Sequence, residues 1–109
     1  LNYENTKFGG ETKIIDVNTK KLSTILEEHN IQHINYLSID VEGGEFEVIK
    51  SINFDDVFID VIGFENNYHD TSIPIIQYLE NKNYKVFYKS LDIFMINLNS
   101  NFIKNIKNK

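Results

Sequence analysis

Apolar and polar positions change their spacing several times along the chain, and these changes predict alternating strands and helices. Compact apolar runs are typical of buried strands. They occur at 14–17, 34–39 and 57–64. Between and after these runs, apolar residues recur every three or four positions, as they do along one face of a helix. This spacing predicts helices at 20–29, 43–53 and 72–80.

Two later runs, 84–88 and 93–98, alternate between apolar and polar residues across a short connection, which predicts an antiparallel hairpin. Strands that alternate with helices form parallel sheets covered by helices. The predicted fold class is therefore α/β, with a mostly parallel sheet that ends in this hairpin. Residues 1–13 lack a clear period and are expected to be an entry loop, followed by an α/β core at 14–98 and a basic tail at 99–109.

Composition narrows the classes of protein to which this single domain can belong. The 109 residues carry a net charge of -5 and 41% hydrophobic residues, as expected for one folded globular unit. An acidic domain lacks the basic surface that neutralises phosphates, so nucleic acid is not an expected partner. No apolar stretch is long enough to cross a bilayer and no signal peptide opens the chain, so we expect no membrane partner and a cytoplasmic location.

Two residue types are missing, and their absence limits the chemistry. The chain has no cysteine, which excludes disulfides, thiolate nucleophiles and cysteine-ligated metal sites. It has no arginine either, so any anion site must use lysine or backbone amides. Lys104, Lys107 and Lys109 lie close together at the end of the chain and predict a solvated tail.

The candidate chemistry lies where two predicted strands end. In open α/β sheets, ligands bind beyond the carboxyl ends of the parallel strands. Asp40 and Glu65 each follow a buried apolar run. Asp40 also begins the string DVEGGE, in which Glu42 and Glu45 have a simpler explanation, since acidic residues stabilise the first turn of a helix through its dipole. Helix capping explains Asp40 poorly, which makes it the stronger candidate.

The segment at 37–50, LSIDVEGGEFEVIK, closely resembles the signature of FkbM-type S-adenosylmethionine-dependent methyltransferases. The resemblance extends from about residue 14 to residue 98, with departures at Lys21 and Asn83. It implies a Rossmann-like class I methyltransferase fold with S-adenosylmethionine as cofactor. The chain lacks the glycine-rich loop that follows the first strand of such a fold. We therefore expect the C-terminal half of the domain, a fragment with no assigned cofactor-binding residues.

The resemblance also implies a reaction, in which the complete protein transfers a methyl group to a hydroxyl of a sugar or small metabolite. Asp40 and Glu65 are the candidate catalytic bases, and Glu42, Asn66 and His69 are expected to bind the small-molecule or glycan acceptor. The alternative is a non-catalytic remnant of a methyltransferase that acts, if at all, through protein association. A half-sheet would expose the edge of its central strand, so the isolated chain is expected to self-associate.

Metal chemistry is a weaker alternative. Oxygen ligands at adjacent strand ends can hold Mg²⁺, and Asp40, Glu65 and Asn66 have that placement. These residues already have other roles in the resemblance, so no metal site is assigned. His29 and His33 are not expected to share a metal ion, because the predicted helix ends between them.

Overall fold

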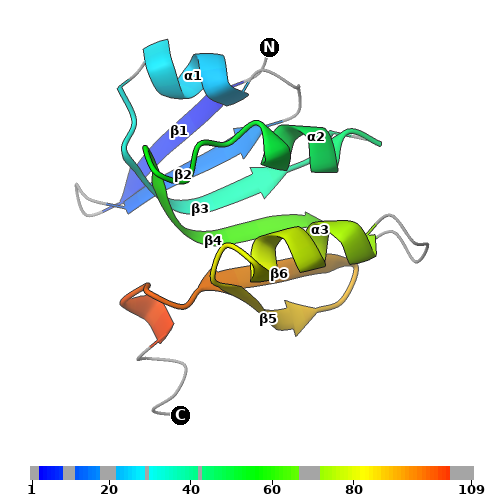
Figure 1. Cartoon of the computed structure of the whole chain (residues 1–109). Coiled ribbons are helices and arrows are strands. Elements are labelled where there is room, and N and C mark those ends of the chain that lie inside the picture. Colours follow the sequence, from blue (N-terminus) through cyan, green and yellow to red (C-terminus); the bar gives the residue numbers. More distant parts are fainter. Residues whose placement is uncertain are drawn as a thin grey trace.

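The computed structural model describes residues 3–8, 12–17, 22–28, 30–41, 43–66 and 72–103. Strands and helices alternate over most of these ranges. In chain order they are β1 (Tyr3–Phe8), β2 (Thr12–Val17), α1 (Leu22–Glu28), β3 (His33–Ile39), α2 (Glu45–Lys50), β4 (Phe58–Glu65), α3 (Ser72–Glu80), β5 (Tyr84–Lys89) and β6 (Asp92–Asn97). The strands form one six-stranded sheet in the order β1-β2-β3-β4-β6-β5 (Figure 1).

The sheet is parallel in its middle and antiparallel toward both edges. β3 pairs in parallel with β2 and with β4, whereas β1 with β2, β4 with β6, and β5 with β6 form antiparallel pairs. The α/β class and the C-terminal hairpin are confirmed. The prediction of a parallel sheet is confirmed for β2, β3 and β4, whereas β1 adds an antiparallel edge that the sequence pattern did not indicate.

The N-terminal residues correct the predicted entry loop. β1 and the start of β2 lie within 1–13, so this segment is not a loop over that part. β1 contains polar residues at most positions. It forms a strand because its backbone pairs with β2, and not because its sequence has an apolar period. β2 in turn pairs along β3, with Ile15 opposite Leu37. β3 is therefore paired on both sides, with β2 and with β4.

The helices end where the sequence offers residues that tolerate a positive φ. Asn30 after α1 and Asn83 after α3 have φ values of 49° and 71°, a left-handed conformation that asparagine tolerates better than most residues. Gly43 has a φ of 75° and forms the turn before α2, which starts at Glu45 rather than at residue 43. Within the described ranges, no helix has the length and the apolar character needed to span a membrane.

The three helices pack on one face of the sheet. Their connections advance across the sheet in the same direction, and right-handed crossovers then place them on the same side. On the covered face, Ile15, Leu37 and Ile62 are completely buried. On the opposite face, Asp16 is exposed and Tyr36 is half-buried. Described side chains of this second face are therefore accessible to a ligand.

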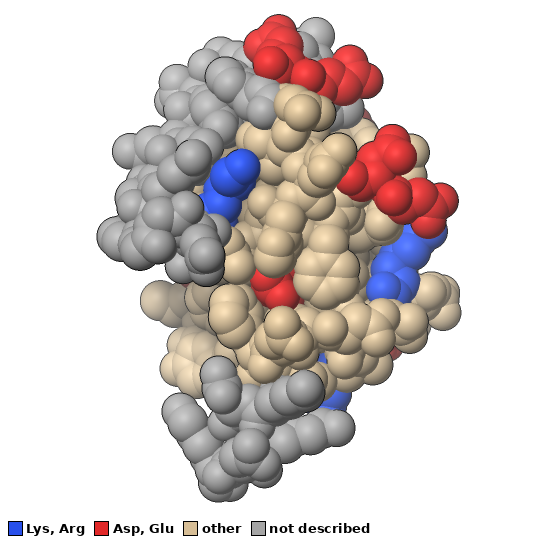
Figure 2. All heavy atoms as spheres, turned by 90° about the vertical axis from the view of Figure 1, so that its left-hand side faces the viewer, with Lys and Arg blue, Asp and Glu red and all other residues tan. Residues whose placement is uncertain are grey.

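A buried carboxylate joins the strands at their amino ends. The Asp60 side chain is 6% exposed, and its Oδ2 lies 2.7 Å from His33 Nε2 and 3.2 Å from Asn35 Nδ2. The Ser100 hydroxyl donates to Oδ1 at 2.5 Å. Figure 2 views the molecule from this end, where a small acidic surface lies among uncharged side chains.

This cluster also corrects the predicted tail at 99–109. Ser100 is 2% exposed, so the chain does not become solvated immediately after β6. The hydroxyl of Ser100 donates to Asp60 and accepts a hydrogen bond from the N–H of Phe102, which holds the start of this segment against the sheet. Lys104, Lys107 and Lys109 lie outside the described residues, so the solvated tail stays a prediction there.

Candidate active site

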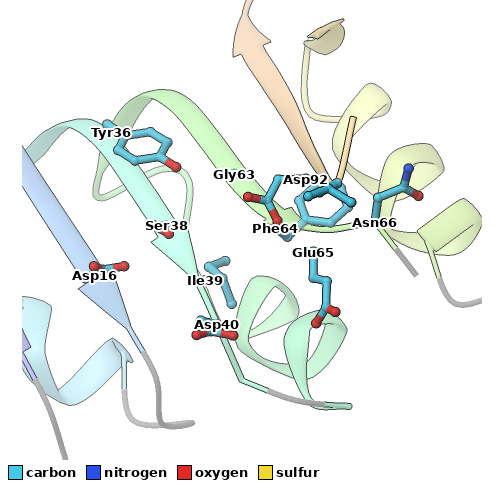
Figure 3. A pocket seen from close by; sticks show the side chains of 11 residues that line it. Asp16, Tyr36, Ser38, Ile39, Asp40, Gly63, Phe64, Glu65, Asn66 and Asp92 are labelled. Carbon is cyan, nitrogen blue, oxygen red and sulfur yellow. The ribbon is translucent and has the colours of Figure 1, made fainter. Parts of the chain in front are cut away.

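A polar hollow of about 690 Å³ opens at the carboxyl ends of β2, β3 and β4, beside the start of β6 (Figure 3). Its described lining residues belong to these strands and to the turns that follow or precede them. They are Asp16, Tyr36, Ser38, Ile39, Asp40, Gly63, Phe64, Glu65, Asn66, Leu91 and Asp92. The lining contains carboxylates from four strand ends and, among the described residues, no lysine. Its charge therefore favours cationic or neutral ligands.

The two predicted catalytic residues lie at neighbouring strand ends. Asp40 follows β3, and its N–H donates to the carbonyl of Val17 at 2.8 Å, which holds the end of β3 against β2. Glu65 ends β4, opposite Asp92 of β6. The side chains of Asp40 and Glu65 are exposed, and neither carboxylate bonds to another described residue. Both carboxylates are therefore free to accept hydrogen bonds from a ligand.

The floor of the hollow depends on a glycine in β4. A Cβ at Gly63 would lie 2.7 Å from the Tyr36 hydroxyl oxygen and 3.2 Å from two ring carbons of Phe94. Both distances are shorter than ordinary contacts of a Cβ atom. The absence of a side chain at Gly63 therefore makes room for the two aromatic side chains above the β4 backbone. Their ring centroids are 6.2 Å apart, and Figure 3 shows the Tyr36 hydroxyl on the side of Gly63.

Tyr36 adds a hydrogen-bond donor to an otherwise acidic lining. Partial burial raises the pKa of Tyr36, and the carboxylates of Asp92 and Asp16 raise it further, against the lowering effect of a hydrogen bond with Ser38. The phenol therefore stays protonated at neutral pH and keeps a proton to donate. The hollow thus offers a donor beside several acceptors.

Asn66 lines the hollow, but its amide nitrogen has a partner within the protein. Its Nδ2 donates to the Ser90 carbonyl at 2.8 Å, and its backbone N–H donates to the Leu91 carbonyl at 2.9 Å. These bonds fix the turn between β5 and β6. They therefore position Leu91 and Asp92 in the lining, whichever contact Asn66 itself makes with a ligand.

Glu45 lies in the first turn of α2, as the sequence predicted, but it is not exposed there. Its side chain is buried, with 4% of the residue exposed. Burial raises the pKa of Glu45, its own backbone N–H lowers it, Glu65 and Asp40 raise it further, and the N–H of Gly43 lowers it slightly. Desolvation therefore outweighs any stabilisation of the charged form by the N-terminus of α2.

The structure brings three of the five predicted site residues together. Asp40, Glu65 and Asn66 line one hollow. Glu42 and His69 lie outside the described residues, and their expected role in acceptor binding stays a prediction.

Sequence reasoning missed several residues of the lining. Tyr36 and Ser38 precede Asp40 at alternate positions of one strand, so all three face the same side. That alternation was a usable signal, but it was hidden within a run that looked uniformly apolar. Asp16 and Asp92 come from β2 and β6, and only the order of strands in the sheet places them beside Asp40.

The described ranges contain no group of three or more His, Cys, Asp or Glu side chains arranged to hold a metal ion. Asp40, Glu65 and Asn66, the alternative Mg²⁺ ligands, therefore gain no further ligand from the described residues. The structure gives this alternative no support.

An α/β sheet with a polar hollow at the carboxyl ends of its parallel strands is typical of domains that bind a small ligand at that edge. The family model for the methyltransferase FkbM domain matches residues 2–86, and the chain belongs to this family. The chain is similar to methyltransferase sdnD of Sordaria araneosa, with 38% identity over 55 residues that cover 43% of this chain and 21% of that protein. It thus spans about a fifth of the length of this curated relative. No solved structure matches the chain.

The described residues fit one part of S-adenosylmethionine, the cofactor that the family implies. Its sulfonium and ammonium groups are positively charged, and the carboxylates of Asp16 and Asp40 match them in charge. The chain contains no G-x-G-x-x-G pattern for the nucleotide part of such a cofactor. The fit therefore concerns the charged end of the cofactor alone.

Proposed function

We propose that this chain forms part of an S-adenosylmethionine-dependent methyltransferase that methylates a hydroxyl group of a sugar or another small metabolite, and that its sheet is the C-terminal half of a Rossmann-like domain. The observation that carries the proposal is the group of exposed carboxylates of Asp40 and Glu65 in one hollow, within a chain that belongs to the FkbM methyltransferase family. The hydroxyl acceptor is what the resemblance to the family implies, and the carboxylates are suited to receive its proton.

In this reaction the residues of the chain position the acceptor and remove its proton. Bound S-adenosylmethionine supplies the methyl group as an electrophile. As the acceptor hydroxyl receives the methyl group, its proton would pass to a carboxylate of this chain, Asp40 or Glu65. The protonated Tyr36 hydroxyl donates to an acceptor oxygen and orients it.

The charge of the lining also limits the acceptor. Asp16, Asp40, Glu65 and Asp92 would repel a phosphate or a carboxylate at the same place. The proposed acceptors are therefore neutral or amine-bearing hydroxyl compounds, and phosphorylated sugars are poor ones.

The test uses the native gene product with methyl-labelled S-adenosylmethionine and a panel of neutral, amine-bearing and phosphorylated hydroxyl compounds. Loss of a general base lowers kcat by about 100-fold or more, and we expect this for Asp40→Asn with an unchanged fold. Asp55→Asn is the matched control, because Asp55 is an exposed carboxylate in the turn before β4, at the other end of the sheet. Equal activity of Asp40→Asn and wild type would contradict the role of Asp40, and no methyl transfer to any acceptor would contradict the proposed function.

A second candidate function, protein association, is favoured by the apolar surface of the β5–β6 hairpin. Phe87, Tyr88 and Leu91 are 42%, 56% and 75% exposed. The rings of Phe87 and Tyr88 lie 6.3 and 6.0 Å from that of Phe94, so the exposed side chains belong to one aromatic surface. Exposed apolar clusters of this kind mark contact surfaces.

Sedimentation of the isolated chain tests this candidate. We expect concentration-dependent self-association that is weakened by replacing Phe87 and Leu91 with Ser. Ile73→Ser is the control, since Ile73 is an exposed apolar residue (52%) that belongs to α3 and not to the hairpin. A monomer at every concentration would contradict the association.

A further inference from the structure

Glu45 is a buried carboxyl group to which the proposed reaction assigns no role. It begins α2 and is 4% exposed. Its Oε2 atom is buried and has no hydrogen-bond partner among the described residues. Buried polar atoms are nearly always paired, and an unpaired buried charge is especially costly. The ionised form of Glu45 is therefore poorly accommodated at this place.

The surroundings of Glu45 are acidic. The charged groups that act on it among the described residues are Glu65, at the end of β4, and Asp40, after β3. No described charged group of α3, the helix that packs beside α2, is among them. The hydrogen bonds to its carboxyl group come from the backbone N–H groups of Glu45 and Gly43. No cation of the described residues compensates a negative charge here.

We propose that Glu45 is a positioning residue that works as a neutral acid: it keeps its proton on the unpaired oxygen and thereby keeps a third negative charge away from Asp40 and Glu65. This inference rests on the proposed function, because Asp40 and Glu65 are the groups that accept the proton of the acceptor. With Glu45 neutral, no further negative charge lies beside those two residues, and the turn that carries Asp40 is not strained by a buried charge.

The pKa of Glu45 is raised, which agrees with this role. Burial raises the pKa of Glu45 against the effect of its own N–H, and both neighbouring carboxylates raise it further. Acids placed near one another in different surroundings commonly divide the protonated and ionised roles between them. Here the buried group is the one that is expected to hold the proton.

The first test compares stability as the pH rises. A raised pKa in the folded state means that the contribution of Glu45 is complete below its unfolded pKa and is lost as the pH rises through the folded value. Glu45→Gln has no proton to lose, so its melting temperature is expected to rise relative to wild type between pH 5 and about pH 8. Glu47→Gln is the matched control, an exposed acid in the same helical turn, and should follow wild type. Parallel curves for Glu45→Gln and wild type would overturn the proposal.

A second measurement does not depend on the folding of a variant. In wild type labelled with ¹³C at the glutamate carboxyl carbons, the signal of Glu45 should titrate at a higher pH than an ordinary glutamate does. Titration of the Glu45 signal in the ordinary range of glutamate would overturn the proposal.

The third measurement is the pH profile of methyl transfer, with each protein compared with its own rate at pH 6. The wild-type rate should fall as Glu45 ionises, whereas the rate of Glu45→Gln should stay level over the same range. A folded Glu45→Gln variant whose profile still falls like that of wild type would overturn the positioning role. Absence of methyl transfer from every protein would instead overturn the proposed function, and the stability and titration results would still report the protonation of Glu45.

Discussion

Both ends of the sheet carry acidic side chains, but the hydrogen bonding of these side chains differs between the two ends. At the amino ends of β3 and β4, both carboxylate oxygens of Asp60 are bonded, to His33, Asn35 and Ser100. At the carboxyl ends, the carboxylates of Asp40 and Glu65 bond to no other described residue.

This difference separates carboxylates that hold the chain together from carboxylates that are available to a ligand. An oxygen that already accepts hydrogen bonds from the protein contributes to stability, and removing it leaves buried donors unpaired. An exposed oxygen without a protein partner contributes little to stability and can accept a bond from a substrate. Mutations at the amino end should therefore act on unfolding, and those at the carboxyl end on binding and turnover.

The largest effect is expected for Asp60→Ala. It leaves the His33, Asn35 and Ser100 donors without their acceptor, and we expect the free energy of unfolding to fall by about 3 kcal/mol. Urea denaturation measures it. Asp40→Ala is the matched change at the other end and should stay within about 0.5 kcal/mol of wild type. Similar losses for both variants would break the contrast between the two ends.

Gly63→Ala should have the next largest effect, because it places a methyl group under the hollow. The Tyr36 hydroxyl and the Phe94 ring must move, at a cost of about 1–2 kcal/mol. Thermal unfolding measures the loss. Adding Tyr36→Phe removes the atom at 2.7 Å and should restore part of the stability, but not all of it, since the contact with Phe94 remains. No restoration would mean that the Tyr36 hydroxyl is not the limiting contact.

Tyr84→Phe tests a second anchor near Asp60. The Tyr84 hydroxyl donates to the Ile59 carbonyl at 2.6 Å, and losing this bond should cost about 1 kcal/mol. Burial raises the pKa of Tyr84, so its contribution is complete below the unfolded value and is lost as the pH rises above about 10. The melting temperature of wild type should therefore fall faster than that of Tyr84→Phe above that pH, and equal slopes would contradict the burial effect.

The smallest effect on stability is expected for Asp16→Asn. Asp16 is exposed in the hollow, so the change should alter the free energy of unfolding by less than about 0.5 kcal/mol. The same change removes one carboxylate from the lining and should strengthen the binding of an anionic probe such as inorganic phosphate, measured by calorimetry. A clear loss of stability would mean that Asp16, like Asp60, stabilises the fold, and would contradict its assignment to the ligand-accessible carboxylates.

Most of the fold could be predicted, because the buried positions of strands and helices require apolar residues at regular intervals in the sequence. The runs that became β3, β4 and the β5–β6 hairpin, and the turn at Asn30, lie where the apolar pattern placed them. β1 could not be predicted in the same way, since backbone bonds to β2 stabilise it and leave no apolar period. Ser100 was assigned to a tail because its partner, Asp60, lies 40 residues earlier in the chain.

Site residues that come directly after a buried strand could be predicted from the sequence. Site residues whose place depends on the order of strands in the sheet could not. Asp40 and Glu65 were identified because polar residues that close buried strands meet at one edge. Asp92 joins them because β6 lies beside β4, a neighbour that the chain order does not reveal. The burial of Glu45 could not be predicted either, because an acidic residue at a helix N-terminus is already explained by its interaction with the helix dipole.

The position of β6 between β4 and β5 also sets the order in which the described sheet is assembled during synthesis. β6 is made after β5 but must pair with β4 on one side and with β5 on the other. A chain on the ribosome that has reached only β5 already contains Asp16, Asp40 and Glu65, yet it lacks the strand that carries Asp92 and supports the far wall of the hollow. Addition of β6 therefore closes both the described sheet and the hollow, so the hollow forms only after this strand has been synthesised, later than its first three carboxylates.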